Sequence, residues 1–316
     1  MDVQSVIENI SILGTQNFEN ITAVPIKTDY NYKIDFLTLE KGLEMGLVEV
    51  KEVSESGVVG TLLVVNNSIS PLILFEGDEV VGSKQNRIIT QTTIIEAKSS
   101  ENISVNCTER GRWLYTDNFR KSNNFANHNT RSHLTADKFY NKSSQMNVWR
   151  EIDELQTRHN FRSDTSSMAE TYEKVNVEIE DALKNFNTVE GQNGIIVFIN
   201  GEIKGIEIFY NPSIYEVYHE KILKSYIIDR DSFEGDGKDD VDYEREIHSL
   251  LSSIKDSEFI KKDSKLGEAY MFKNESGIGS YFSFEEENIQ LQYLTLDVKG
   301  YSNDGDDDLV FDDLAY

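Results

Sequence analysis

Charged and amide side chains crowd residues 71–113, where they interrupt apolar, strand-like runs. An arginine guanidinium and an amide can hydrogen-bond to phosphate groups and to ribose or base edges, and Gly82 lets backbone N–H groups approach a ligand. The ring of Trp113 can stack on a base. The candidate ligand-binding residues are Glu76, Glu79, Lys84, Gln85, Asn86, Arg87, Glu109, Arg112 and Trp113. Their types indicate a site for a small anionic ligand.

A structural interpretation of the same residues stays open. Buried charges usually pair, so Arg87 or Arg112 would form an ion network with one of the three glutamates, and we expect Arg87 and Glu76 to share one electrostatic cluster. In an extended strand, alternate members of the Lys84–Arg87 run face opposite sides, so the four side chains cannot hold one ligand unless a bulge redirects them. Trp113 is equally expected as a packing residue at the end of a strand.

Neither catalysis nor metal binding has a recognisable motif. Cys107 is the single cysteine, which excludes an internal disulfide. A nucleophilic thiol needs a lowered pKa and a base, and no histidine spacing identifies a partner, so we expect a core thiol. The histidines lack HxxH and HExxH spacings, and Leu309 stands where a calcium loop after Asp304 requires glycine. No catalytic residue, metal ion or cofactor is predicted.

The net charge constrains the partners of the protein. The 316 residues include 56 acidic and 31 basic side chains, a formal charge of −25. A nucleic-acid backbone or an anionic membrane needs a basic footprint, so neither is expected as the main partner. The N-terminus lacks the pattern of a signal peptide, and eighteen apolar residues never run together, so we expect a cytoplasmic protein without a membrane span.

The first half of the chain is predicted to be rich in strands. Between residues 21 and 107, short apolar or alternating runs are separated by turns every eight to twelve residues, a pattern typical of an antiparallel sandwich or barrel. A short helix is predicted within residues 36–46. We expect a β-rich domain over residues 1–115. Residues 116–147 are rich in Asn, Ser, Thr and Arg and are interpreted as a polar linker with short helices.

The second half, residues 148–301, is predicted to be an α+β domain. A capping box at Ser167 opens a helix, and Asn211 followed by proline opens another. Asn200-Gly201 between two β-rich runs predicts a hairpin, while Gly205 within a strand pattern indicates a bulge or a close backbone approach. The predicted fold class is α+β, with an N-terminal antiparallel β-sandwich or barrel-like domain followed by an α+β domain.

Two dense motifs, EGDEVVGSKQNR (residues 76–87) and VNCTERGRW (residues 105–113), resemble the ARPP-1 family. The later segment GIIVFINGEIKGIEIFYNPSIYEVYHEKILKSY is similar to the second half of that family, so the resemblance covers most of residues 30–228. Asp78, Ser83 and Thr108 are mild departures that leave the charged positions in place. The family name refers to proteins associated with ADP-ribosylglycohydrolases and with rhodanese/phosphatase-superfamily proteins. The resemblance thus implies a role in NAD or ADP-ribose metabolism.

Two functions therefore compete. The first is an intracellular protein that binds or processes an ADP-ribose or NAD-related metabolite, a small nucleotide-sugar ligand. The second is a non-catalytic scaffold whose acidic surface and tail bind a basic protein. The tail, residues 302–316, combines dense aspartates with bunched apolar residues, so we expect either a solvated end or a peptide that docks on a partner.

Overall fold

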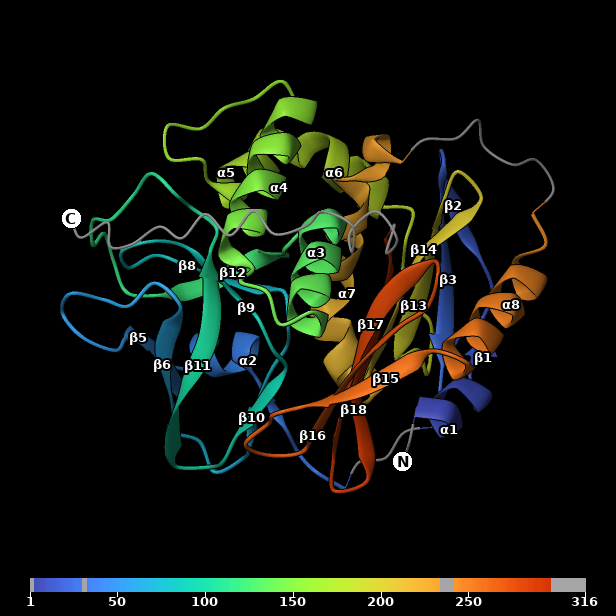
Figure 1. The fold of residues 1–316 in the computed structure, drawn as a ribbon, viewed down its shortest axis with the longest axis horizontal. Helices are drawn as coiled ribbons and strands as arrows, with labels where there is room; N and C mark the ends of the chain where they lie inside the picture. The colour runs from blue at the N-terminus through green and yellow to red at the C-terminus, as the bar shows by residue number, and fades with distance from the viewer. Residues whose placement is uncertain (1–2, 30–32, 234–240, 297–316) are drawn as a thin grey trace.

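The computed structural model describes residues 3–29, 33–233 and 241–296, and Figure 1 shows how their elements are arranged. The acidic tail of residues 302–316 lies outside the described residues. The fold is mixed α+β with antiparallel sheets, as the sequence predicted. In the described part of the chain, no helix combines the length and the apolar character needed to cross a membrane.

The first half forms two sheets that pack on each other. Their elements are β4 (Leu37–Thr38), α2 (Leu39–Glu44), β5 (Val48–Glu52), β6 (Thr61–Asn66), β7 (Leu72–Leu74), β8 (Asp78–Val81), β9 (Arg87–Ile89), β10 (Thr93–Ile95), β11 (Ser99–Cys107) and β12 (Arg120–Phe125). Six strands follow the order β12-β8-β9-β11-β6-β5 and three follow β10-β7-β4, with only β4 and β7 parallel among these pairs. Leu39, Val64 and Ile89 belong to the core between them.

A large antiparallel sheet makes the other side of the molecule. It runs in the order β1-β3-β13-β14-β18-β17-β16-β15, with β2 beside β3. Its strands, with the short helix α1 (Val3–Glu8) ahead of them, are β1 (Ser11–Ile12), β2 (Gln16–Phe18), β3 (Ile21–Lys27), β13 (Gly194–Ile199), β14 (Glu202–Phe209), β15 (Glu258–Lys262), β16 (Glu268–Lys273), β17 (Gly277–Phe284) and β18 (Glu287–Thr295). The predicted domain of residues 1–115 thus contributes strands to both sides, because β3 pairs with β13 rather than with its neighbours in sequence.

The remaining helices pack around and between the two sides. They are α3 (His128–Phe139), α4 (Gln145–Arg158), α5 (Met168–Lys174), α6 (Asn176–Leu183), α7 (Pro212–Ile227) and α8 (Tyr243–Lys255), with a 3-10 turn η1 (Arg230–Ser232). Helices α3 and α7 lie between the large sheet and the strands of the first half, and α1 and α8 cover the outer face of the large sheet (Figure 1). One apolar cluster contains side chains from both halves, including Phe75 and Phe209. Their rings pack edge to face, with 4.8 Å between the ring centroids.

Residues 116–147 do not form the predicted polar linker. They contain β12, which pairs with β8, and α3, which packs against α4 and the large sheet. Several of the polar side chains that suggested a loop are buried there: Asn127, Thr130 and Arg131 have no exposed surface. Each finds hydrogen-bond partners inside the molecule, so part of the polar composition reflects a polar interior.

Local signals in the second half are confirmed. The Ser167 hydroxyl accepts the Glu170 N–H at 3.4 Å, although the helix that it opens is broken at Val175 into α5 and α6. Asn200 and Gly201 join β13 to β14, both with positive φ as a tight hairpin turn requires. Gly205 lies at a register shift, and a Cβ there would come within 2.0 Å of the Tyr226 hydroxyl. The bulge and the close approach are therefore both present.

Candidate functional site

The run Lys84–Asn86 lies in a turn between β8 and β9, and not in an extended strand. Gly82 has a φ of 118° and Ser83 a φ of 48°, and a Cβ on Gly82 would lie 2.6 Å from the carbonyl oxygen of Asn118. Only glycine fits that first position. The turn redirects the side chains, so the alternation expected for a strand does not hold here.

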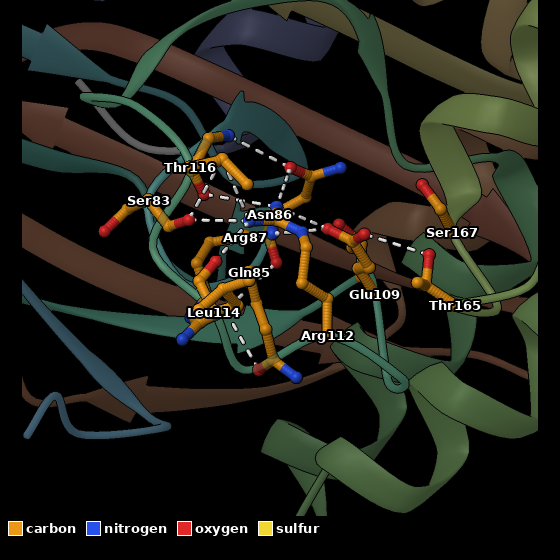
Figure 2. Close-up of polar contacts among 12 residues, drawn as sticks. Ser83, Gln85, Asn86, Arg87, Glu109, Arg112, Leu114, Thr116, Thr165 and Ser167 are labelled. Atoms are coloured by element: carbon orange, nitrogen blue, oxygen red, sulfur yellow. Dashed lines mark hydrogen bonds and ion pairs between the residues drawn. The ribbon is translucent and has the colours of Figure 1, made fainter.

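Arg112 connects this turn by hydrogen bonds to the loop that follows β11 (Figure 2). Its Nη2 donates to Glu109 Oε2 at 2.6 Å and to Asn86 Oδ1 at 3.2 Å. Its Nη1 donates to the carbonyl oxygen of Ser83 at 2.6 Å. Thr165 in turn donates to Glu109 Oε1 at 2.9 Å, so the carboxylate is satisfied on both oxygens. The ion-network interpretation is confirmed for Arg112 and Glu109.

Arg87 is fully buried but has no carboxylate within ion-pair distance among the described residues. Its Nη1 donates to Gln85 Oε1 at 3.2 Å, while its Nε and Nη2 have no hydrogen-bond partner in the described structure. The Trp113 ring covers it, with 5.7 Å between the guanidinium carbon and the ring centroid, and Lys84 Nζ lies 5.4 Å from the same ring. Trp113 therefore packs on two cations.

Glu76 is separate from Arg87, so the expectation of one shared cluster was wrong. Its carboxylate accepts from Lys138 Nζ at 2.5 Å and from the Thr135 hydroxyl at 2.9 Å, both on α3. The cause is the strand geometry. Glu76 ends the segment that leads into β8 and faces α3, whereas Arg87 begins β9 and faces the side of Trp113.

Gly82, Ser83, Asn86, Glu109 and Arg112 are called the Arg112 cluster below. Glu79 forms a second buried network beside this cluster. It accepts hydrogen bonds from the Thr108 hydroxyl at 2.9 Å and from the Ser122 hydroxyl at 2.7 Å. Burial raises the pKa of Glu79 to about 7, although these hydrogen bonds oppose the rise. A carboxyl group that titrates near neutral pH can accept or return a proton under physiological conditions, which is the property of a general acid–base residue.

The Arg112 cluster forms one wall of a polar cavity of about 550 Å³. Gly82, Asn86, Glu109 and Arg112 come from this cluster. The remaining walls come from β12, the first turns of α5, the helix α6 and Lys224 of α7. The volume falls within the roughly 300–1,000 Å³ that is typical of small-molecule sites.

A second cavity, of about 640 Å³, adjoins the first. The two share Lys121, Asn123, Glu180 and Lys224 in their linings, so two ammonium groups stand where they meet. Lys224 Nζ lies 3.1 Å from the half-exposed carboxylate of Glu180. Lys121 pairs with Glu44, which is also half-exposed, and its Nζ lies 3.7 Å from the buried Glu40 carboxylate. Because Glu44 and Glu180 are half-exposed, their carboxylates can turn to solvent and a ligand anion can take their place.

A buried triad of Lys221, Glu40 and Asp78 adjoins the second cavity, which Lys221 and Glu40 line. Lys221 Nζ donates to Asp78 Oδ1 at 2.6 Å and also to Glu40. Burial raises the pKa of Asp78 to about 7, against the attraction of the Lys221 ammonium. Asp78 is thus held in the interior by a lysine from α7.

The sequence indicated only one wall of these cavities. Lys121, Ser122, Asn124 and Lys224 were missed, since the first three lie in the segment interpreted as a linker. A usable signal was present in NFRKSNNF, where the apolar Phe119 and Phe125 bracket a run of polar residues; both phenylalanines are buried. Lys224 of α7 is 7% exposed.

Cys107 is a core thiol, as its sequence context indicated. It is fully buried at the end of β11, and burial raises the pKa of its thiol to about 11 despite the nearby Arg87 guanidinium. The neutral thiol is a poor nucleophile. Among the described residues, no group of three or more His, Cys, Asp or Glu side chains is arranged to hold a metal ion.

Comparison with known proteins gives one match. The model of a family described as the "ARG and Rhodanese-Phosphatase-superfamily-associated Protein domain", ARPP-1, matches residues 9–294. No curated protein and no solved structure matches the chain significantly. The matched residues include the Arg112 cluster, Glu79 and both polar cavities.

Proposed function

The chain belongs to the ARPP-1 family, and from this premise we propose that it binds or processes a metabolite related to ADP-ribose or NAD. The family is associated with ADP-ribosylglycohydrolase and rhodanese–phosphatase systems, which supports a substrate of the ADP-ribose class. The structural observation that carries the proposal is the pair of adjoining polar cavities with Lys121 and Lys224 at their junction.

The shape of the paired cavities suits a ligand of two polar halves joined by a diphosphate. The diphosphate would lie at the junction and take the place of the Glu44 and Glu180 carboxylates on the two lysines. One ribose would lie in the first cavity, where Glu109, Asn86 and Ser122 offer acceptors and donors for its hydroxyl groups. A dinucleotide-like metabolite has this arrangement, whereas a mononucleotide would occupy one cavity only.

Processing would require a proton acceptor, and Glu79 supplies one next to the first cavity. Ser122 lines this cavity and donates to Glu79 Oε2, so a proton can pass between the cavity and the buried carboxyl group through the serine hydroxyl. We assign Glu79 and Ser122 the proton-transfer role if the ligand is turned over.

Calorimetric titration tests binding directly. We expect ADP-ribose and NAD to bind, and AMP and ribose 5-phosphate to bind more weakly because each lacks half of the ligand. The variant Lys224→Met should weaken ADP-ribose binding about tenfold or more, the effect of losing one charge-assisted hydrogen bond. Lys184→Met, which removes an exposed lysine paired with Asp181, is the matched control and should leave binding unchanged.

A scaffold that binds a basic protein is the second candidate, favoured by the formal charge of −25. The same titrations separate the two functions. If none of the four compounds binds at millimolar concentration, the scaffold is the better account. Equal binding of ADP-ribose to Lys224→Met and to the unaltered protein would show that the ligand does not lie at the junction of the cavities.

A further inference from the structure

A third cavity shares no lining residue with the two polar cavities described above. It has a volume of about 390 Å³ and lies between the end of α3, the loop before β10, and strands β15 to β18. Its lining combines three lysines and the carboxylates of Glu76 and Asp263 with an apolar surface of Ala269, Met271 and Phe282. The lysines are Lys138, Lys142 and Lys262.

Gln290 lines this cavity and presents an unsatisfied donor. The side chain is 2% exposed, and its Nε2 has no hydrogen-bond partner among the described residues. The backbone N–H of Glu76 donates to the Thr92 hydroxyl at 3.1 Å, which leaves the hydroxyl proton for Gln290 Oε1. With Gln290 Oε1 on the Thr92 hydroxyl, the Nε2 N–H groups remain for another acceptor. Buried donors normally have an acceptor, and the site lacks one.

Lys262 adds a cation without a carboxylate partner. Its Nζ donates to Asn141 Oδ1 at 2.7 Å and to the carbonyl oxygen of Phe139 at 3.3 Å, and no acidic side chain of the described residues lies within ion-pair distance. Lys138, by contrast, is paired with Glu76. Burial and the neighbouring Lys138 lower the pKa of Lys262, and the Asp263 carboxylate, which also lines the cavity, opposes this effect.

We propose that this cavity binds a small organic anion, a carboxylate or phosphate group carried on a compact apolar body. The anionic oxygens would accept from Gln290 Nε2 and Lys262 Nζ, and the apolar body would pack on Met271 and Phe282. This pairing satisfies the unpartnered amide and the unpaired ammonium at once, and it uses the apolar side of the cavity. The site is independent of the proposed ADP-ribose site.

Probe ligands of matched shape test the proposal by calorimetry. Benzoate and phenyl phosphate carry the two anionic groups on the same ring, and benzamide is the neutral counterpart of benzoate. We expect at least one of the anions to bind and benzamide to bind about tenfold more weakly or not at all. Tighter binding of phenyl phosphate would assign the site to phosphate esters, and tighter binding of benzoate would assign it to carboxylates.

Variants locate the bound anion. Lys262→Met should weaken binding about tenfold or more, and Gln290→Leu should also weaken it. Lys261→Met is the control, because Lys261 is the adjacent residue of β15, points to solvent and pairs with Glu268. Thermal melts would show that each variant is folded. No binding of either anion up to about 10 mM would overturn the proposal, as would equal binding to Lys262→Met and the unaltered protein.

Discussion

Replacing Arg131 by methionine should lower the free energy of unfolding by about 3–5 kcal/mol, the largest effect expected for a single substitution here. Arg131 and Glu207 are fully buried and form an ion pair between α3 and β14. Arg131 also donates to Gln292 Oε1 at 2.9 Å and to the Ser225 hydroxyl at 2.8 Å. Without the guanidinium, Glu207 becomes a buried carboxylate without a cation, which is the costly outcome.

Urea denaturation measures this effect, and two further variants identify its cause. Arg245→Met removes an arginine whose side chain is 72% exposed and should change stability by less than about 0.5 kcal/mol. The double variant Arg131→Met/Glu207→Gln removes both charges and should recover part of the loss. A loss below about 1 kcal/mol for Arg131→Met would mean that the pair is not buried as described.

The second large effect concerns the pH dependence of stability, through Glu79. Burial raises the pKa of Glu79 from its ordinary value of 4.5 to about 7. Between these two pH values the folded protein keeps the proton while the unfolded chain releases it, so stability falls as pH rises through this window. One carboxyl group shifted over this range contributes about 3 kcal/mol to the fall. Below pH 4.5 both states are protonated, and well above pH 7 both are ionised.

Glu79→Gln should therefore flatten the stability profile. As the pH rises from about 4.5 to about 8, the free energy of unfolding of the variant should increase by about 3 kcal/mol relative to that of the unaltered protein. Urea denaturation at several pH values measures this difference. Asp78, whose pKa burial also raises to about 7, should leave a residual slope. Glu178→Gln, at an exposed position of α6, is the control and should leave the profile unchanged. Parallel profiles for Glu79→Gln and the unaltered protein would show that Glu79 does not titrate in this range.

Features that depend on a few adjacent residues could be predicted from the sequence. The Asn200-Gly201 hairpin, the cap at Ser167 and the cap at Asn211 all follow from local backbone chemistry. The segment that became β12 and α3 could not be predicted in the same way. Its polar side chains are satisfied by partners far away in sequence, such as Asp229 for Asn127, and these partners become visible only in the folded chain.

The candidate site was predicted in part for the same reason. Arg112 pairs with Glu109, one of the three glutamates expected as partners. Asn86 joins them because it lies just before β9, Glu109 and Arg112 lie just after β11, and these two strands are paired. The junction of the cavities instead joins Lys121 of β12 to Lys224 of α7, about one hundred positions apart in the chain, and no periodicity links the two. Arg87 and Glu76, eleven positions apart, diverge because the turn at Gly82 reverses the chain between them.

A crystal structure of the protein grown with ADP-ribose would show whether the ligand lies at the junction of the two cavities. We expect a diphosphate within hydrogen-bond distance of Lys121 Nζ or Lys224 Nζ, with the Glu44 and Glu180 carboxylates turned away and one ribose beside Glu109. Ligand density elsewhere on the molecule, with both lysines still paired to their carboxylates, would refute the proposed site.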